Sequence, residues 1–187
     1  MIEEIFHKVK HDAKLFVPKF AWSDDINEVA DKINIPHKDD YPLRVGKTKE
    51  LIEQYLEGNL KPERGMGSLY RISAYDIKQM HSYLFRGFPY NEKNILVGEY
   101  RKVGVEVNKV GGYVFPEPLQ IPYLMDKITP IEFGNNERTA FFANEEPDFI
   151  WWYQLFQTIH PFQDGNGRVG GIVVACLSYS MYKKYLM

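Results

Sequence analysis

Cysteine is almost missing from this sequence. Cys176 is the single cysteine among 187 residues, so no disulfide can form within the chain. It lies in the apolar run from Ile172 to Leu177, where a buried structural thiol is expected and a reactive one is not. A chain without disulfides suits a reducing compartment, and the expected location is the cytoplasm.

An excess of charge and long apolar runs are missing as well. The chain has 23 Lys and Arg against 25 Asp and Glu, a net charge of -2, which predicts no basic surface for nucleic acid. No apolar run is long enough to span a bilayer, and the N-terminus lacks the basic and apolar regions of a secretory signal peptide. Neither a nucleic acid nor a membrane is therefore expected as a partner.

Internal repeats and low-complexity tracts are absent too, and the remaining pattern is that of a mainly α-helical protein. Hydrophobic residues make up 44% of the chain, enough for a sizeable core. Ser73 with Asp76 three residues on forms a capping-box pattern, and Ser23 or Asp25 could cap an earlier helix. Apolar spacing or flanking Gly and Pro predict helices within residues 1–20, 24–34, 47–57, 74–86, 119–128, 147–160 and 168–186.

One small β-hairpin is expected beside these helices. Val103, Val105 and Val107 alternate with polar or small residues, as in a short strand. Gly111 and Gly112 supply a turn, and residues 113–115 can return as a second strand.

The most informative segment is His160-Pro161-Phe162-Gln163-Asp164-Gly165-Asn166-Gly167-Arg168, between two strongly apolar helices. His160 lies at a helix end, so its ring can face a cleft, and histidine is the natural base for a hydroxyl near neutral pH. Asp164 supplies the hard carboxylate oxygens that Mg²⁺ prefers. A base and a metal ligand so close together indicate a transfer reaction.

The second half of the segment has the features of an anion site. Gly165, Asn166 and Gly167 let backbone N–H groups approach a ligand, and the next helix points its N-terminus at the same place. Arg168 adds a positive fork for phosphate. Asp-Gly and Asn-Gly are also common turn dipeptides, but a simple turn would not require His160 or Arg168. The segment therefore predicts phosphoryl or nucleotidyl transfer.

These residues resemble the Fic signature, H-x-F-x-D/E-G-N-G-R-x-x-R, at His160, Phe162 and residues 164–168. Upstream, Gly98-Glu99-Tyr100-Arg101 is similar to the G-x-Y-R element of the family, and residues 103–118 are similar to its flap hairpin. The resemblance covers residues 47–187 and implies a Fic-type helical domain there. Residues 1–46 are then an N-terminal helical extension of unknown role.

The resemblance implies a protein adenylyltransferase, which moves AMP from ATP to a Ser, Thr or Tyr hydroxyl of a target protein. His160 would be the general base, and Asp164 would hold Mg²⁺. The nucleotide phosphates would lie against Gly165, Asn166, Gly167 and Arg168. Val105 and Val107 of the flap would dock the target. The oligomeric state, including a homo-oligomer, is left open.

One position departs from the family pattern, and a second position that matches it lacks its partner. The final arginine of the signature, which meets the γ-phosphate, is replaced by Gly171. Glu57 stands where the inhibitory motif of the family has a glutamate that pairs with that arginine, so Glu57 is a candidate inhibitory residue without its partner. The alternatives are a Fic-fold transferase for another phosphate-containing group, or a weakly active pseudoenzyme that acts as a binding module. The related Doc-type toxins, which transfer phosphate, have lysine where this chain has Gly167.

Overall fold

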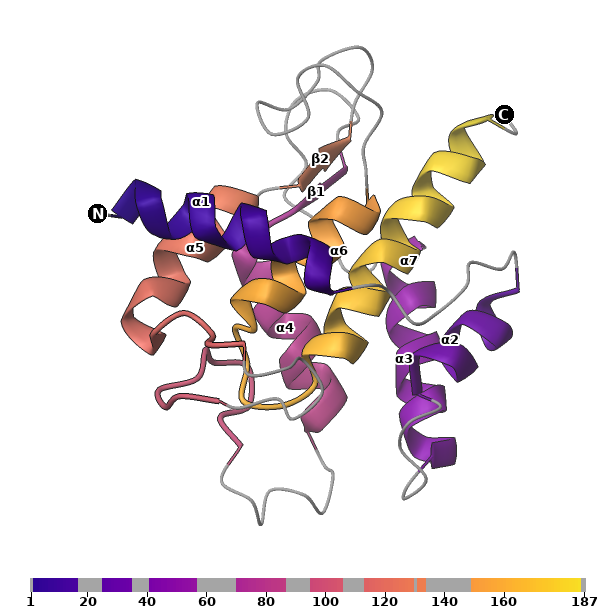
Figure 1. The fold of residues 1–187 in the computed structure, drawn as a ribbon. Helices are drawn as coiled ribbons and strands as arrows, with labels where there is room; N and C mark the ends of the chain where they lie inside the picture. The colour runs from indigo at the N-terminus through magenta and orange to yellow at the C-terminus, as the bar shows by residue number, and fades with distance from the viewer. Residues whose placement is uncertain are drawn as a thin grey trace.

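The computed structural model describes residues 2–16, 25–34, 41–56, 70–86, 95–105, 113–129, 131–133 and 149–185. Within these ranges the chain is mainly helical, which confirms the predicted fold class. Figure 1 shows the helices gathered around α6 and the first part of α7. The helices are α1 (Ile2–Asp12), α2 (Ile26–Asn34), α3 (Tyr41–Leu56), α4 (Ala74–Phe85), α5 (Ile121–Ile128), α6 (Phe149–Ile159) and α7 (Asn166–Tyr185), with short 3-10 turns η1 (Ala13–Leu15) and η3 (Pro118–Gln120).

The centre of the core is the contact between α6 and α7. Trp152 and Phe156 of α6 and Val169 of α7 are completely buried. Gly170 lets the two helices approach closely, because a Cβ at this position would lie 3.0 Å from both Gln157 Nε2 and Tyr153 Cε2. The segment that links these two helices carries the signature residues, so this packing fixes both of its ends.

The N-terminal helices pack into the same core. Val9 of α1 and Val29 of α2 belong to the cluster of buried residues that α6 and α7 build. Asn34 at the end of α2 donates from Nδ2 to Thr48 Oγ1 of α3 at 2.9 Å. Helix α3 begins at Tyr41, earlier than the predicted residue 47, since Pro42 fits in the first turn of a helix.

The strands differ from the expectation. An antiparallel pair is formed by β1 (Tyr70–Ile72) and β2 (Ile131–Phe133), which the sequence did not predict. The expected hairpin is not shown: residues 101–105 and 113–117 carry no strand, and the remainder lies outside the described residues. The carbonyls of Val103 and Pro116 accept hydrogen bonds from the side chain of Arg101.

Two predicted helix caps are present. Ser73 and Asp76 form the capping box of α4, with Asp76 N–H donating to Ser73 Oγ at 3.2 Å. Asp25 caps α2, because its Oδ1 accepts from the N–H of Asn27 at 2.8 Å. Among the helices that the structure describes, none has both the length and the apolar composition to cross a membrane.

Candidate active site

His160 lies just beyond the end of α6 in a left-handed backbone conformation. Its φ is 50°, the one positive value at a non-glycine residue in the described part of the chain. Its N–H still donates to Phe156 O at 2.9 Å, so His160 ends the helix in the place where glycine is usual. Pro161 follows and disfavours a helical conformation at the residue before it. The left-handed conformation thus turns the chain out of the helix at His160.

The imidazole of His160 is largely buried and neutral. Its ring centroid lies 4.7 Å from that of Phe115. Nδ1 is buried and makes no hydrogen bond within the described residues. Burial lowers the pKa of His160 to about 4, with a smaller contribution in the same direction from Arg101, while the Gln157 carbonyl and Asp164 oppose the shift. At neutral pH the ring can therefore accept a proton.

Arg101 holds the main chain around His160. The Arg101 side chain is 1% exposed, and its Nε donates to His160 O at 2.8 Å. Its other nitrogens donate to Val103 O at 3.0 Å and Pro116 O at 2.6 Å, and its backbone N–H donates to Pro161 O at 2.9 Å. One buried guanidinium thus joins the loop after α6 to both described ends of the flap segment. Arg101 belongs to the G-x-Y-R element, but the sequence alone indicated no role for it.

Asn166 closes the loop from the other side. Its Oδ1 accepts from Phe162 N–H at 2.9 Å, and its Nδ2 donates to Phe162 O at 2.8 Å. Gln157 Nε2 donates to Asn166 O at 3.0 Å, which ties this residue to α6. The Asn166 side chain therefore shapes the loop, and only its backbone N–H is left to meet a ligand. Phe162 is completely buried.

Asp164 is the accessible carboxylate of the loop. Its side chain is 52% exposed, and Oδ1 accepts from Gly165 N–H at 2.6 Å. Oδ2 lies 3.6 Å from Nη2 of Arg168, whose guanidinium is buried at 4.6 Å from the ring centroid of Phe85. Arg168 thus places a positive charge directly beneath the carboxylate, at the beginning of α7.

Gly165, just before α7, and Gly167, in the first turn of α7, differ in whether packing requires a glycine. Gly165 has φ +80°, and a Cβ there would lie 2.4 Å from Cε2 of Phe85. Gly167 is exposed, and a Cβ there would meet nothing closer than the Tyr153 hydroxyl at 3.9 Å. Packing thus requires Gly165, whereas Gly167 leaves an open surface over the first turn of α7.

The start of α7 is suited to an anion and to a metal bound with it. The first N–H groups of a helix lack intrahelical partners and favour negative charge. The described residues contain no cluster of three His, Cys, Asp or Glu that could hold a metal alone. Mg²⁺ usually binds through one or two carboxylates together with phosphate oxygens and water. The exposed Asp164 beside the α7 N-terminus fits that arrangement.

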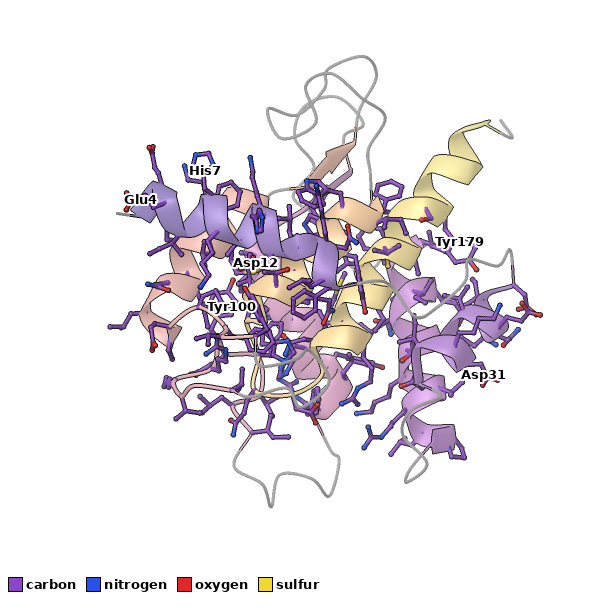
Figure 2. All side chains as sticks on the ribbon, in the orientation of Figure 1. Glu4, His7, Asp12, Asp31, Tyr100 and Tyr179 are labelled. Atoms are coloured by element: carbon purple, nitrogen blue, oxygen red, sulfur yellow. The ribbon has the colours of Figure 1, made fainter. Side chains whose placement is uncertain are left out.

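The other predicted site residues are only partly placed. Val105 is half-buried at the end of the described segment 95–105. Tyr100 of the same segment is labelled in Figure 2, where it lies below α1. Its ring centroid lies 5.8 Å from that of Phe162. Gly171 is buried within α7. Val107 and Glu57 lie outside the described residues.

Comparison with known proteins gives the family. The model of the Fic/DOC family matches residues 71–177, more than half of the chain. The chain belongs to the Fic/DOC family. The chain is also similar to a probable protein adenylyltransferase of Aquifex aeolicus (strain VF5), with 39% identity over 59 residues. That match covers 32% of the chain but only 17% of the length of the relative.

The left-handed His160 gives a test of strain in this Fic/DOC domain. His160→Gly and His160→Ala both remove the imidazole, but only glycine adopts a positive φ without strain. The glycine variant is expected to be more stable than the alanine variant by about 1 kcal/mol. Urea unfolding of both variants measures this difference. Equal stability would contradict the left-handed conformation.

Gly165 and Gly167, on either side of the first residue of α7, give a matched pair of variants. Gly165→Ala brings a methyl group into the Phe85 ring at a positive φ, and is expected to lower the free energy of unfolding by about 1–3 kcal/mol. Gly167→Ala is expected to be neutral or slightly stabilising, because alanine is the better helix former. Thermal unfolding compares the two. A Gly167→Ala variant as unstable as Gly165→Ala would be evidence against this arrangement of the loop.

Proposed function

We propose that this chain is a protein adenylyltransferase, which transfers AMP from ATP to a Ser, Thr or Tyr hydroxyl of a target protein. The observation that carries the proposal is the position of neutral His160 on the same short loop as Asp164 and the α7 N-terminus. A proton acceptor and a phosphate-binding helix end lie at the two ends of this loop. Both are needed to join a hydroxyl to a nucleotide phosphate.

In the proposed reaction, His160 Nε2 takes the proton of the target hydroxyl. The hydroxyl oxygen forms a bond to the α-phosphorus of ATP, the bond from that phosphorus to the α,β-bridging oxygen breaks, and pyrophosphate leaves. The phosphates would lie against residues 165–167, where the backbone N–H groups of Asn166 and Gly167 bind them, and Arg168 adds positive charge beneath them. Mg²⁺ bound by Asp164 and the phosphates would neutralise charge on the pyrophosphate.

Two further features support nucleotidyl transfer over phosphate transfer. The relative from Aquifex aeolicus carries the name of a probable protein adenylyltransferase. Gly167 leaves the surface over the α7 N-terminus open, where the Doc-type toxins have a lysine. The target hydroxyl would be presented by a segment docked along Val105 and Val107, in the cytoplasm.

Gly171 favours a second candidate, a weakly active protein that binds nucleotide. The γ-phosphate would lack the final arginine of the signature, so ATP would be held and oriented less well. Without that arginine, Glu57 could inhibit the transfer only by repelling the ATP phosphates or by pairing with Arg168. Transfer of another phosphate-containing group remains the third candidate, since the loop and helix end would serve it equally.

Labelled ATP distinguishes these functions. The protein is incubated in a lysate with Mg²⁺ and ATP labelled at the α- or the γ-phosphate. Label on a protein from the α-labelled ATP alone is expected, and His160→Ala should lower it by about two to four orders of magnitude. Asp164→Ala and excess chelator should abolish it, whereas Gly171→Arg should increase it at low ATP.

The alternative outcomes are equally specific. Label from γ-labelled ATP alone would indicate phosphate transfer and overturn the proposal. Label from neither, with ATP still bound, would support the binding module. Undiminished labelling by folded His160→Ala would remove the assignment of the base.

A further inference from the structure

A second histidine, His81 of α4, lies directly beneath the candidate site. Its side chain is completely buried. The ring is stacked between two phenylalanines, with centroids 4.6 Å from Phe85 at an interplanar angle of 25° and 4.1 Å from Phe162 at 15°. Such stacking fixes the plane of the imidazole.

Both nitrogens of His81 bind main-chain groups from distant parts of the sequence. The N–H of Gly98 donates to Nδ1 at 2.9 Å, so Nδ1 carries no proton. The proton must then be on Nε2, which lies 3.1 Å from Asp164 O and donates to it. The two hydrogen bonds therefore require a neutral ring with its proton on Nε2.

The approach of Gly98 to this ring depends on its being glycine. Its φ is +74°, and a Cβ there would lie 3.1 Å from Cβ of Ser82 on α4. Three residues later the same segment supplies Arg101, which binds His160 O. His81 thus connects the segment that holds the base to the residue that carries the exposed carboxylate.

Each part of the signature loop has its own anchor. His160 is held by Arg101, and Phe162 is held by Asn166 within the loop. Asp164 is held at its carbonyl by His81. Since Asp164 precedes a glycine in a left-handed conformation, loss of the carbonyl contact would let its carboxylate move relative to the α7 N-terminus.

We infer that His81 is a positioning residue whose Nε2–H holds the Asp164 main chain so that the carboxylate meets the metal of a metal–nucleotide complex. The inference rests on the proposed function for the identity of that ligand. Groups that orient a metal ligand without touching the metal typically contribute 10- to 100-fold to metal affinity or activity. His81 should act on metal binding without contact with metal, nucleotide or target.

The first test needs neither a variant nor a ligand. Nitrogen chemical shifts of the imidazole in the free wild-type protein report which nitrogen carries the proton. A neutral ring with the proton on Nε2 is expected at pH 7. A proton on Nδ1, or a charged ring at that pH, would overturn the inference and leave the proposed function untouched.

The second test measures binding of Mn²⁺ together with a non-hydrolysable ATP analogue. His81→Phe keeps an aromatic ring between Phe85 and Phe162 but loses both hydrogen bonds, and is expected to weaken Mn²⁺ binding by about 10- to 100-fold. His81→Gln keeps one acceptor and one donor and should recover part of the loss. His7→Phe is the matched control, because His7 is exposed on the outer side of α1 (Figure 2).

Three results would overturn the inference. A folded His81→Phe protein that binds Mn²⁺ as the wild type does would show that the polar contacts are unimportant. A larger loss in His81→Gln than in His81→Phe would show that His81 contributes packing only. If the wild type itself binds no Mn²⁺ with the analogue, the proposed function fails too, and this result is seen without any His81 variant.

Discussion

The arrangement of the candidate site depends on one buried cation, the guanidinium of Arg101. Burying a charge is costly unless hydrogen bonds replace water, and Arg101 makes three of them to main-chain carbonyls. In the described part of the chain no carboxylate forms an ion pair with it. Three carbonyls from separate parts of the chain can reach one guanidinium only if those parts lie close together. Arg101 therefore requires that the loop after α6 and residues 103 and 116 of the flap segment converge on it.

This convergence explains how the protein tolerates a strained and poorly solvated histidine. His160 has a left-handed backbone, and burial keeps its ring neutral, two features that other contacts must maintain. Arg101 holds its carbonyl, and the α6–α7 packing fixes the ends of the loop. The result is a neutral imidazole and a helix N-terminus that the fold itself sets in place, the kind of preorganisation that the proposed reaction requires.

The sequence predicted the parts of the site that lie in one short segment. The helical fold and the loop that begins at His160 follow from local pattern and residue chemistry, although α7 begins at Asn166, two residues earlier than predicted. The contact between His81 and Asp164 joins residues 83 positions apart, which no local pattern can predict. Asn166 was expected to meet a ligand through its backbone N–H, and nothing in the sequence indicated that its side chain pairs with the backbone of Phe162. The alternation of Val103 and Val105 indicated a strand. The carbonyl of Val103, which a strand would use to pair with its neighbour, instead accepts a hydrogen bond from the side chain of Arg101.

The central claim is that Arg101 and the fold hold His160 as a buried, neutral base in the free protein. The most direct measurement is a titration of the His160 ring by nuclear magnetic resonance, for the wild type and for Arg101→Met. The account predicts a wild-type pKa of about 4. For the variant it predicts a rise toward the ordinary value near 6.5, as water reaches the ring and the cation is lost. A wild-type ring that titrates near 6.5 would contradict the account.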